Sequence, residues 1–258
     1  MKGTWGIIDR SGNFILKPKY DYLGSFREGR AVFRVGKFEE RHNRCRYGYL
    51  DKNGAEAVPA VFHYACSFSE TLAAAKVGNL WGYIDLSGLF KITPRFEGTR
   101  QGPSRIEETR AGYFVNGLAP VWSGHGYGFI DTAGKFVIEG GFDEANSFCE
   151  GRAVVKRGKR FGFVDSEGRM SSECKFTLAR DFSEGLARLI EEEPRVGFYP
   201  PSGFINLHGQ MVIEPLFYSA GSFQDGLCLV ETEDSIGYIN KQGEYVWKGP
   251  YVEYGVVL

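Results

Sequence analysis

The amino-acid sequence predicts an all-β fold assembled from tandem repeats, and three observations support this prediction. Glycine accounts for 35 of the 258 residues, about twice its usual share of ~7%. Aromatic residues account for 15% of the chain, and many glycines with many aromatics are typical of short strands joined by tight turns. Two short motifs also recur at fixed spacing, which is the sequence signature of a repeat architecture.

The first motif is an aromatic residue, Gly, an aromatic residue or Ile, then Ile, Val or Leu, and finally Asp-x-x-Gly. Its clearest copies are WGIIDRSG (5–12), YGYLDKNG (47–54), WGYIDLSG (81–88), YGFIDTAG (127–134) and FGFVDSEG (161–168). Two weaker copies, SGFINLHG (202–209) and IGYINKQG (236–243), carry Asn in place of Asp. We therefore place seven hairpins along the chain, beginning near residues 5, 47, 81, 127, 161, 202 and 236.

The second motif has the pattern Phe-x-acidic-Gly-x-Ala and follows most copies of the first. It reads FREGRA (26–31), FSETLA (68–73), FVNGLA (114–119), FCEGRA (148–153), FSEGLA (182–187) and FQDGLC (223–228). The early Gly of the first motif precedes the fourth residue of the second by 23 positions in five of six cases. The return distance is 11 in four of six cases, so the period is 34 residues, interrupted by insertions of 8, 12 and 7.

These motifs resemble those of the bacterial WG-repeat family, also called KWG repeats, over nearly the whole chain. The resemblance implies a single domain (1–258) of tandem β-repeats that serves for interaction or surface display. It implies no catalytic residues.

Each unit is predicted to contain three strands. In the fourth copy, residues 127–131 form the first strand, and 135–138 form its antiparallel partner across a tight turn. A stretch of about ten irregular or extended residues follows, anchored by Phe142 and Phe148, and leads to a third strand at 151–156. A helix is predicted only at 103–110, where Ser104 and Glu107 form a capping box.

A three-stranded unit cannot bury both of its faces alone, so neighbouring units must stack. A closed, propeller-like ring of seven units is favoured over an open superhelical array, because closure removes two exposed edges. Residues 250–258 contain a shortened strand of the second-motif type (253–257), which can pair with residues 5–9 and close the ring.

The aligned acidic or amide position of the first motif is interpreted as structural. Asp and Asn are favoured at the start of tight turns, where the side chain accepts backbone N–H groups two or three residues on. The residues concerned are Asp9, Asp51, Asp85, Asp131, Asp165, Asn206 and Asn240. The leading aromatics, Trp5, Tyr47, Trp81, Tyr127 and Phe161, are likewise assigned to packing rather than to a sugar- or base-stacking ladder, with the adjacent Gly leaving room.

Composition and motifs exclude several classes of protein. The 31 Lys and Arg against 32 Asp and Glu, a net charge of −1, argue against a nucleic-acid-coating protein. Five cysteines without a C-x-x-C pair argue against a disulfide framework and a structural zinc site. No apolar run is long enough to span a membrane, and the expected location is cytoplasmic, although a secreted or periplasmic chain with its signal removed has the same appearance. No nucleophile, metal or phosphate-loop motif stands in its required context, so no enzyme and no cofactor are predicted.

Function in a repeat scaffold is expected in its irregular features, the three insertions. The candidate binding residues are arginines, aromatics and histidines in or next to them, because Arg and aromatic side chains anchor protein interfaces. They are Arg41, His42, Arg44, Arg46, Arg100, Arg105, Arg110, Trp122, His125, Arg195 and Tyr199. The alternative that the insertions are three solvated loops without a binding partner stays open, because surface loops tolerate insertion.

The function predicted from the sequence is therefore a non-enzymatic β-repeat scaffold that binds a macromolecule, in the first place a protein, through its inserted loops. One alternative is a carbohydrate- or nucleotide-binding module that uses aromatics in a groove or channel. A second is a hydrolase whose site is assembled from residues distant in sequence. Nucleic-acid binding rests only on the basic hairpin at 152–160 and is disfavoured.

Overall fold

The computed structural model describes residues 4–36, 45–97, 112–193 and 200–250. The chain forms two compact units, residues 1–140 and 141–258. Within the described residues there are twenty-five β-strands and no helix, which confirms the all-β prediction. In every sheet the strands pair antiparallel with their neighbours in the chain, so each sheet is a simple meander.

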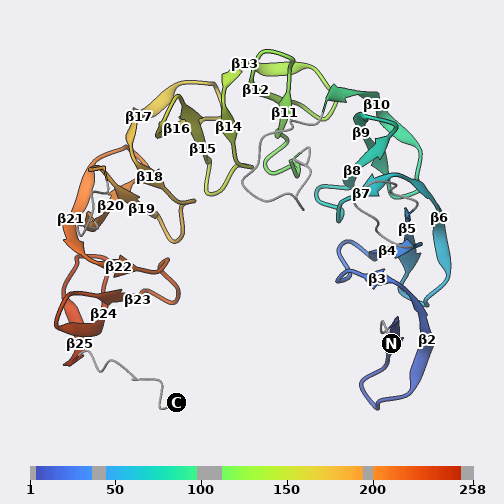
Figure 1. Ribbon diagram of the computed structural model, residues 1–258, viewed down its shortest axis with the longest axis horizontal. Helices are drawn as coiled ribbons and strands as arrows, with labels where there is room; N and C mark the ends of the chain where they lie inside the picture. Colours follow the sequence, from blue (N-terminus) through green and yellow to red (C-terminus); the bar gives the residue numbers. More distant parts are fainter. Residues whose placement is uncertain (1–3, 37–44, 98–111, 194–199, 251–258) are drawn as a thin grey trace. The chain divides into compact units, whose positions relative to one another are not determined.

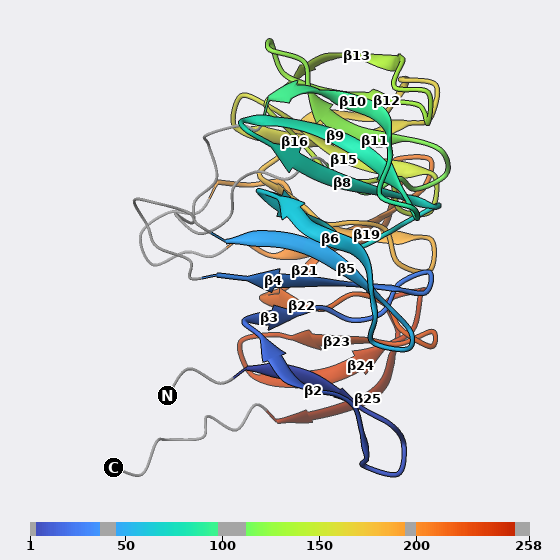
Figure 2. The ribbon, with the colours of Figure 1, turned by 90° about the vertical axis from the view of Figure 1, so that its right-hand side faces the viewer.

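The first unit contains four small sheets that follow one another along the chain (Figures 1 and 2). Their strands are β1 (Trp5–Ile8) and β2 (Phe14–Tyr20); β3 (Tyr22–Leu23), β4 (Arg30–Val35), β5 (Arg46–Asp51) and β6 (Glu56–Phe62); β7 (Tyr64–Ala65), β8 (Leu72–Val77), β9 (Leu80–Asp85) and β10 (Phe90–Glu97); and β11 (Ala119–Trp122), β12 (Tyr127–Ile130) and β13 (Phe136–Phe142), the last reaching into the boundary of the unit.

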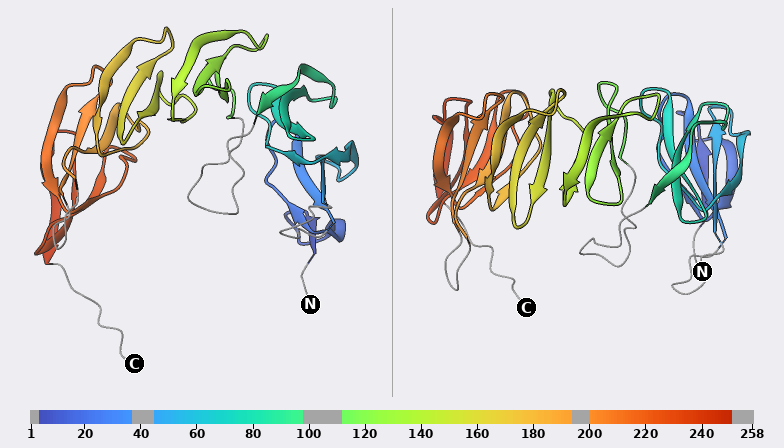
Figure 3. Two further views of the ribbon diagram at one scale, coloured as in Figure 1. Left: turned by 45° about the horizontal axis from the view of Figure 1, so that its top comes forward. Right: turned by 90° about the horizontal axis from the view of Figure 1, so that it is seen from above.

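The second unit contains three sheets of four strands each, arranged in the same way (Figure 3). Their strands are β14 (Glu144–Ala145), β15 (Arg152–Arg157), β16 (Arg160–Asp165) and β17 (Met170–Phe176); β18 (Leu178–Ala179), β19 (Leu186–Ile190), β20 (Ser202–Asn206) and β21 (Met211–Phe217); and β22 (Ser219–Ala220), β23 (Cys228–Glu231), β24 (Ser235–Ile239) and β25 (Tyr245–Pro250).

The three predicted strands recur in six of the seven sheets, the first sheet containing only the hairpin β1–β2, and five sheets have a further two-residue strand. This strand occupies part of the predicted irregular stretch. It forms because the strand of the second motif has an open edge, and the chain runs along that edge: the N–H groups of Asp21 and Gly24 donate to the carbonyls of Arg34 and Val32 at 3.0 and 2.8 Å. Phe142 and Phe148 are buried anchors, as predicted. The predicted helix at 103–110 and residues 251–258 lie outside the described residues, so ring closure stays a prediction.

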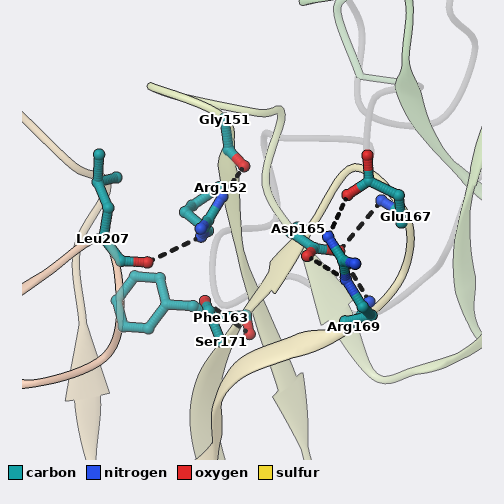
Figure 4. Close-up of polar contacts among 8 residues, drawn as sticks. All are labelled: Gly151, Arg152, Phe163, Asp165, Glu167, Arg169, Ser171 and Leu207. Carbon is teal, nitrogen blue, oxygen red and sulfur yellow. Dashed lines mark hydrogen bonds and ion pairs between the residues drawn. The ribbon is translucent and has the colours of Figure 1, made fainter.

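The turn of the first motif is held by its Asp or Asn side chain, which confirms the structural interpretation of this position. Asp131 Oδ1 accepts the backbone N–H groups of Ala133 and Lys135 at 3.0 and 2.9 Å. The same two contacts, to the residues two and four positions on, form at Asp165, where Arg169 also pairs with the carboxylate (Figure 4). The second contact is therefore one residue further along than expected. Asn206 makes both bonds through its amide oxygen, which explains why a neutral residue serves here.

The Gly of the first motif is required by the backbone of the neighbouring strand. In the pairing of β16 with β17, Phe161 lies opposite Phe176 and Phe163 opposite Ser172. A step of two residues on β16 therefore corresponds to four on β17, so β17 contains a bulge with two extra residues. This bulge brings the Ser172 carbonyl oxygen within 2.6 Å of where a Cβ on Gly162 would lie. The room that Gly162 leaves is thus taken up by the bulged strand. Other repeats have Pro in this bulge, which they tolerate because an unpaired position needs no N–H.

The hydrophobic core lies between successive sheets of a unit rather than within one sheet. The aromatic residue at the third position of the first motif packs against the Phe of the next second motif. Ring centroids are 4.8 Å apart for Tyr49–Phe68 and Tyr83–Phe114, 5.0 Å for Phe163–Phe182 and 5.2 Å for Phe204–Phe223. Of the leading aromatics, Tyr47, Trp81 and Tyr127 are buried and Phe161 is half-buried, as expected for packing, whereas Trp5 in the first sheet is exposed.

Carboxylates of the second motif connect successive repeats within each unit. Glu70 accepts the backbone N–H groups of Asn116 and Gly117, and Glu150 accepts those of Glu184 and Gly185, at 2.6–2.8 Å. These acidic residues have positive φ, 52° at Glu70 and 51° at Glu150. Arg152 adds a contact from its Nε to the Leu207 carbonyl at 3.0 Å (Figure 4). Side chains of one repeat thus satisfy the turn backbone of the next.

Replacing Gly162 by Ala is expected to lower the free energy of unfolding by more than about 2 kcal/mol, because the bulged backbone of β17 must move. Gly158→Ala is the control for loss of a glycine. Gly158 has a φ of 61°, and nothing lies within 4 Å of where its Cβ would lie, so the expected cost is about 1 kcal/mol from the backbone conformation alone. Urea denaturation of both variants measures the difference. Equal losses would contradict the role of the bulge.

Replacing Asp85 by Asn is expected to reduce the acid sensitivity of the protein. The Ser87 hydroxyl, 2.5 Å from Oδ1, and the backbone N–H groups of Leu89 and Ser87 lower the pKa of Asp85 to about 2, against the opposing effect of burial. A carboxyl with a lowered folded-state pKa contributes stability above its unfolded pKa of about 4 and loses it as the pH falls toward 2. The fall in melting temperature from pH 6 to pH 3 should therefore be smaller for Asp85→Asn than for the unchanged chain. An identical fall would show that this turn does not contribute.

Candidate functional site

Three of the eleven predicted binding residues lie within the described residues: Arg46, Trp122 and His125. The other eight, Arg41, His42, Arg44, Arg100, Arg105, Arg110, Arg195 and Tyr199, lie outside them. Arg46 is half-buried at the start of β5, where its Nη1 donates to the Cys45 carbonyl at 2.9 Å. His125 is exposed in the turn between β11 and β12, and its backbone N–H approaches Ser123 Oγ at 3.4 Å.

Trp122 lines a cleft of about 280 Å³ that we call the tryptophan cleft. Its lining residues are Arg95, Phe96, Glu97, Trp122, Ser123, Gly124 and Phe136. The indole packs edge-on against Tyr127, with ring centroids 5.4 Å apart. Arg95 donates a hydrogen bond to the Gly134 carbonyl and lies over the Phe96 ring, so its side chain already has partners. The structure thus places Trp122 in a cleft but does not bring Arg46 or His125 into it.

A second cleft of about 190 Å³ in the same unit has a different character, and we call it the tyrosine cleft. It is lined by Tyr22, Val32, Arg34, Tyr47, Tyr64, Ala65, Cys66, Ser67 and Tyr113. Arg34 and Tyr47 stand in the sequence on either side of the first insertion, and Tyr113 follows the second. The first insertion therefore leaves and re-enters the described structure beside this cleft, whereas the second leaves at Glu97 in the tryptophan cleft and returns beside the tyrosine cleft.

The Arg34 guanidinium is the polar centre of the tyrosine cleft. Its Nη2 makes a long contact of 3.4 Å to the Asp21 carbonyl, and its Cζ lies 5.9 Å from the centroid of the Tyr22 ring. Its Nε is buried and has no hydrogen-bond partner among the described residues. Burial raises the pKa of Tyr47, and a hydrogen bond with Arg34 opposes that rise. The cleft thus holds a cation whose donor capacity the protein itself leaves partly unused.

The repeat-equivalent cleft of the second unit shows what is particular about this one. It has a similar volume, about 220 Å³, and includes Glu144 and Phe161 at the positions of Tyr22 and Tyr47. There the residue equivalent to Arg34 is Lys156, which pairs with Glu144 at 2.5 Å directly across the two strands. Lys156 is not among the lining residues of this cleft, whereas Arg180 is. Arg34 lies opposite Tyr22 instead of an acid. The change from Glu to Tyr leaves the charge of Arg34 without a carboxylate partner at this position.

Four residues of the tyrosine cleft, Tyr22, Arg34, Tyr64 and Tyr113, were not predicted as binding residues, and Tyr47 was assigned to packing. A signal was present in the repeat alignment. Tyr113 occupies the position before the motif Phe, where the other repeats have Ser or Asp, which is a departure from the repeat pattern next to an insertion. Tyr22 occupies a variable position, with Tyr64, Glu144, Leu178 and Ser219 as its equivalents, and gives no such signal.

The described residues contain no group of three or more His, Cys, Asp or Glu side chains arranged to hold a metal ion. Across the same part of the chain, none of the elements is a helix with the length and hydropathy needed to cross a membrane.

Comparison with known proteins agrees with the repeat geometry described above. The sequence matches the family described as "WG containing repeat" at residues 5–37, 47–81, 127–160, 161–189 and 203–234, more than half of the chain. The chain belongs to the WG-repeat family. This confirms the resemblance drawn from the motifs, and the matched segments coincide with five of the seven WG repeats. No curated protein matches the chain.

Solved structures resemble the chain in fold. A crystal structure of the eukaryotic initiation factor aligns with a TM-score of 0.51 at 14% identity, over 77% of this chain and 59% of that one. Hsv2p of Kluyveromyces lactis aligns with a TM-score of 0.40 at 10% identity, over 70% and 60% of the two chains. A protein of unknown function from Bacteroides caccae aligns with a TM-score of 0.32 at 12% identity, over 80% and 90%. The aligned part of the chain spans about three fifths of the first two proteins, and at such identities the likeness concerns the fold alone.

Replacing Arg34 by Met is expected to change the free energy of unfolding by less than about 1 kcal/mol, because the loss of the long Asp21 contact and the Tyr47 hydrogen bond is offset by the removal of a buried Nε without a partner. Arg188→Met is the control. The Arg188 side chain donates to Ser202 Oγ at 3.0 Å and to the Ala220 carbonyl at 2.5 Å, so losing it should cost about 1–3 kcal/mol. Urea denaturation compares the two. A larger loss for Arg34→Met would mean that Arg34 has a structural role.

Proposed function

We propose that this WG-repeat protein is a binding scaffold for another protein, without catalytic activity of its own. The partner contacts the inserted loops and places an acidic side chain or other anionic group in the tyrosine cleft. The observation that carries the proposal is the position and content of that cleft: four tyrosines and an arginine, with no carboxylate among the lining residues, lie beside the first insertion and where the chain returns from the second.

The composition of the tyrosine cleft supports a protein partner. Tyr and Arg are the side chains most enriched, with Trp, among residues that dominate binding energy at protein interfaces. Tyrosine offers a large amphipathic contact area with few rotatable bonds, so holding it in place costs little conformational entropy. Tyr22 and Tyr113 are exposed, Tyr47 is buried, and Arg34 lies between them in exposure. The cleft therefore has both a fixed base and an accessible rim.

The size of the clefts favours a macromolecular partner over a small ligand. The three clefts described above have volumes of about 190, 220 and 280 Å³. Sites that enclose nucleotides or drug-sized ligands usually have about 300–1,000 Å³. The tyrosine cleft is the smallest of the three and accommodates one side chain of a partner. The carbohydrate- or nucleotide-binding alternative would instead use a larger space, and the hydrolase alternative would need a convergent pair of catalytic groups, which nothing in these clefts supplies.

Capture of partners from native lysate tests the proposal. The bait would be the tagged 258-residue chain, compared with Arg34→Ala and with a variant whose three insertions are trimmed to the 34-residue period. A protein retained by the intact chain should be lost with the trimmed variant, and its affinity for Arg34→Ala should fall at least about tenfold, as for an interface hot spot.

The matched control is Lys156→Ala, which removes the cation at the position equivalent to Arg34 in the second unit. Its capture should equal that of the intact chain. Equal capture by all variants would move the binding site onto the regular repeat surface. Capture by none, the intact chain included, would contradict the protein-scaffold function and favour a screen of small ligands.

A further inference from the structure

The first and last sheets each expose apolar residues, chiefly Ile8, Tyr238 and Trp247, at positions that are buried in the interior sheets. At each interface between successive sheets of a unit, the earlier sheet packs the third residue of its first motif against the following sheet. The following sheet packs the fourth residue of its own first motif against the earlier one. At the two terminal sheets one of these partners is missing from the described residues. We define the head face as Ile8 and Phe14 of the first sheet, and the tail face as Leu229, Tyr238 and Trp247 of the last sheet.

The head face differs sharply from its equivalents. Ile8 is 59% exposed, and Phe14, its direct partner across β1 and β2, is also exposed. The equivalent fourth-position residues that follow another sheet of the same unit are 1% exposed or less: Leu50, Ile84, Ile130, Ile205 and Ile239. Each of them packs into a hydrophobic cluster with the preceding sheet, as Ile239 does with Phe204 and Phe217. The head face is thus half of a repeat interface without its other half.

The tail face is the complementary half. Tyr238 is 43% exposed, whereas Tyr49, Tyr83, Phe163 and Phe204 at the same position are at most 1% exposed. Trp247, directly opposite Tyr238 on β25, is 55% exposed, and its equivalents Val58, Ile92 and Ile213 are buried. Leu229 pairs with Tyr238 on the same face and is also exposed. In the interior interfaces such a face is covered by the aliphatic fourth-position residue and the motif Phe of the following sheet.

We propose that the tail face of one copy of this chain binds the head face of a second copy, continuing the repeat interface from one molecule to the next. The occupant is a WG-repeat sheet because the interior interfaces show that such sheets cover these positions, and a second copy of the 258-residue chain supplies one. The two faces are different, so the contact is heterologous: each copy can offer a head to one neighbour and a tail to another. Exposed aromatic and aliphatic side chains grouped on one face supply the driving force.

Sedimentation velocity over a range of concentrations tests the proposal. The intact chain should form species of two or more copies whose share increases with concentration. Ile8→Glu and Trp247→Glu should each weaken self-association at least about tenfold, because either places an unpaired charge in an apolar contact. Both side chains are exposed, so the single chains should keep their circular dichroism spectrum and melting temperature.

Mixing the two variants provides the decisive result. Ile8→Glu keeps an intact tail and Trp247→Glu keeps an intact head, so their mixture should form a one-to-one complex with twice the 28.9 kDa mass of the chain, and nothing larger. Leu216→Glu is the control, because Leu216 is an exposed leucine that belongs to neither face; its self-association should equal that of the intact chain.

Two outcomes would overturn the proposal. An intact chain that stays monomeric at all concentrations would mean that the faces are covered within one molecule, as in a closed ring, or bind nothing. Self-association that persists in both single variants would place the contact elsewhere. Neither outcome bears on the tyrosine cleft, whose residues belong to neither end face.

Discussion

The packing of one small sheet on the next is the interaction on which the structure depends. A WG sheet has at most four strands, both of its faces carry apolar side chains, and it encloses no core by itself. Burial comes from the aromatic pairs that join successive sheets, such as Tyr83 with Phe114 and Phe204 with Phe223. Because each sheet is completed by its neighbour, stability in such an array depends on contacts between adjacent repeats more than on any single unit.

The recurring motif residues serve this stacking, each through a separate contact. The Asp or Asn closes the hairpin turn, the Gly admits a bulged partner strand, and the Glu of the second motif accepts N–H groups from the next turn. Glu150 shows the last of these, with both carboxylate oxygens used by Glu184 and Gly185. Because the polar groups at these positions are already engaged within the repeat framework, they are poor candidates for contacts with a ligand.

The candidate site arises where the repeats depart from one another. Tyr22 stands at a position where one later repeat has Glu144, and the arginine opposite it has no counterpart to the carboxylate that pairs with Lys156. The same logic applies at the two terminal sheets, where the repeat pattern continues but the covering sheet is absent from the described residues. In a protein made of similar units, candidate binding surfaces are therefore found by comparing equivalent positions and identifying those that lack the partner present in the other repeats. Tyr238 is one example, since it is exposed whereas its equivalent Phe204 is buried.

Spacing and turn chemistry were enough to predict the all-β class, the 34-residue period, the turn function of Asp131 and its equivalents, and the buried anchors Phe142 and Phe148. These features are local or periodic, so they leave a regular trace along the chain. Three further features emerged only from the folded chain: the motif Gly faces a bulged backbone, a fourth short strand pairs along the second-motif strand, and the residues of the tyrosine cleft share one space. They depend on which residues of different repeats meet when sheets stack. Residues as far apart in the chain as Tyr22 and Tyr113 give no periodic sign of that meeting.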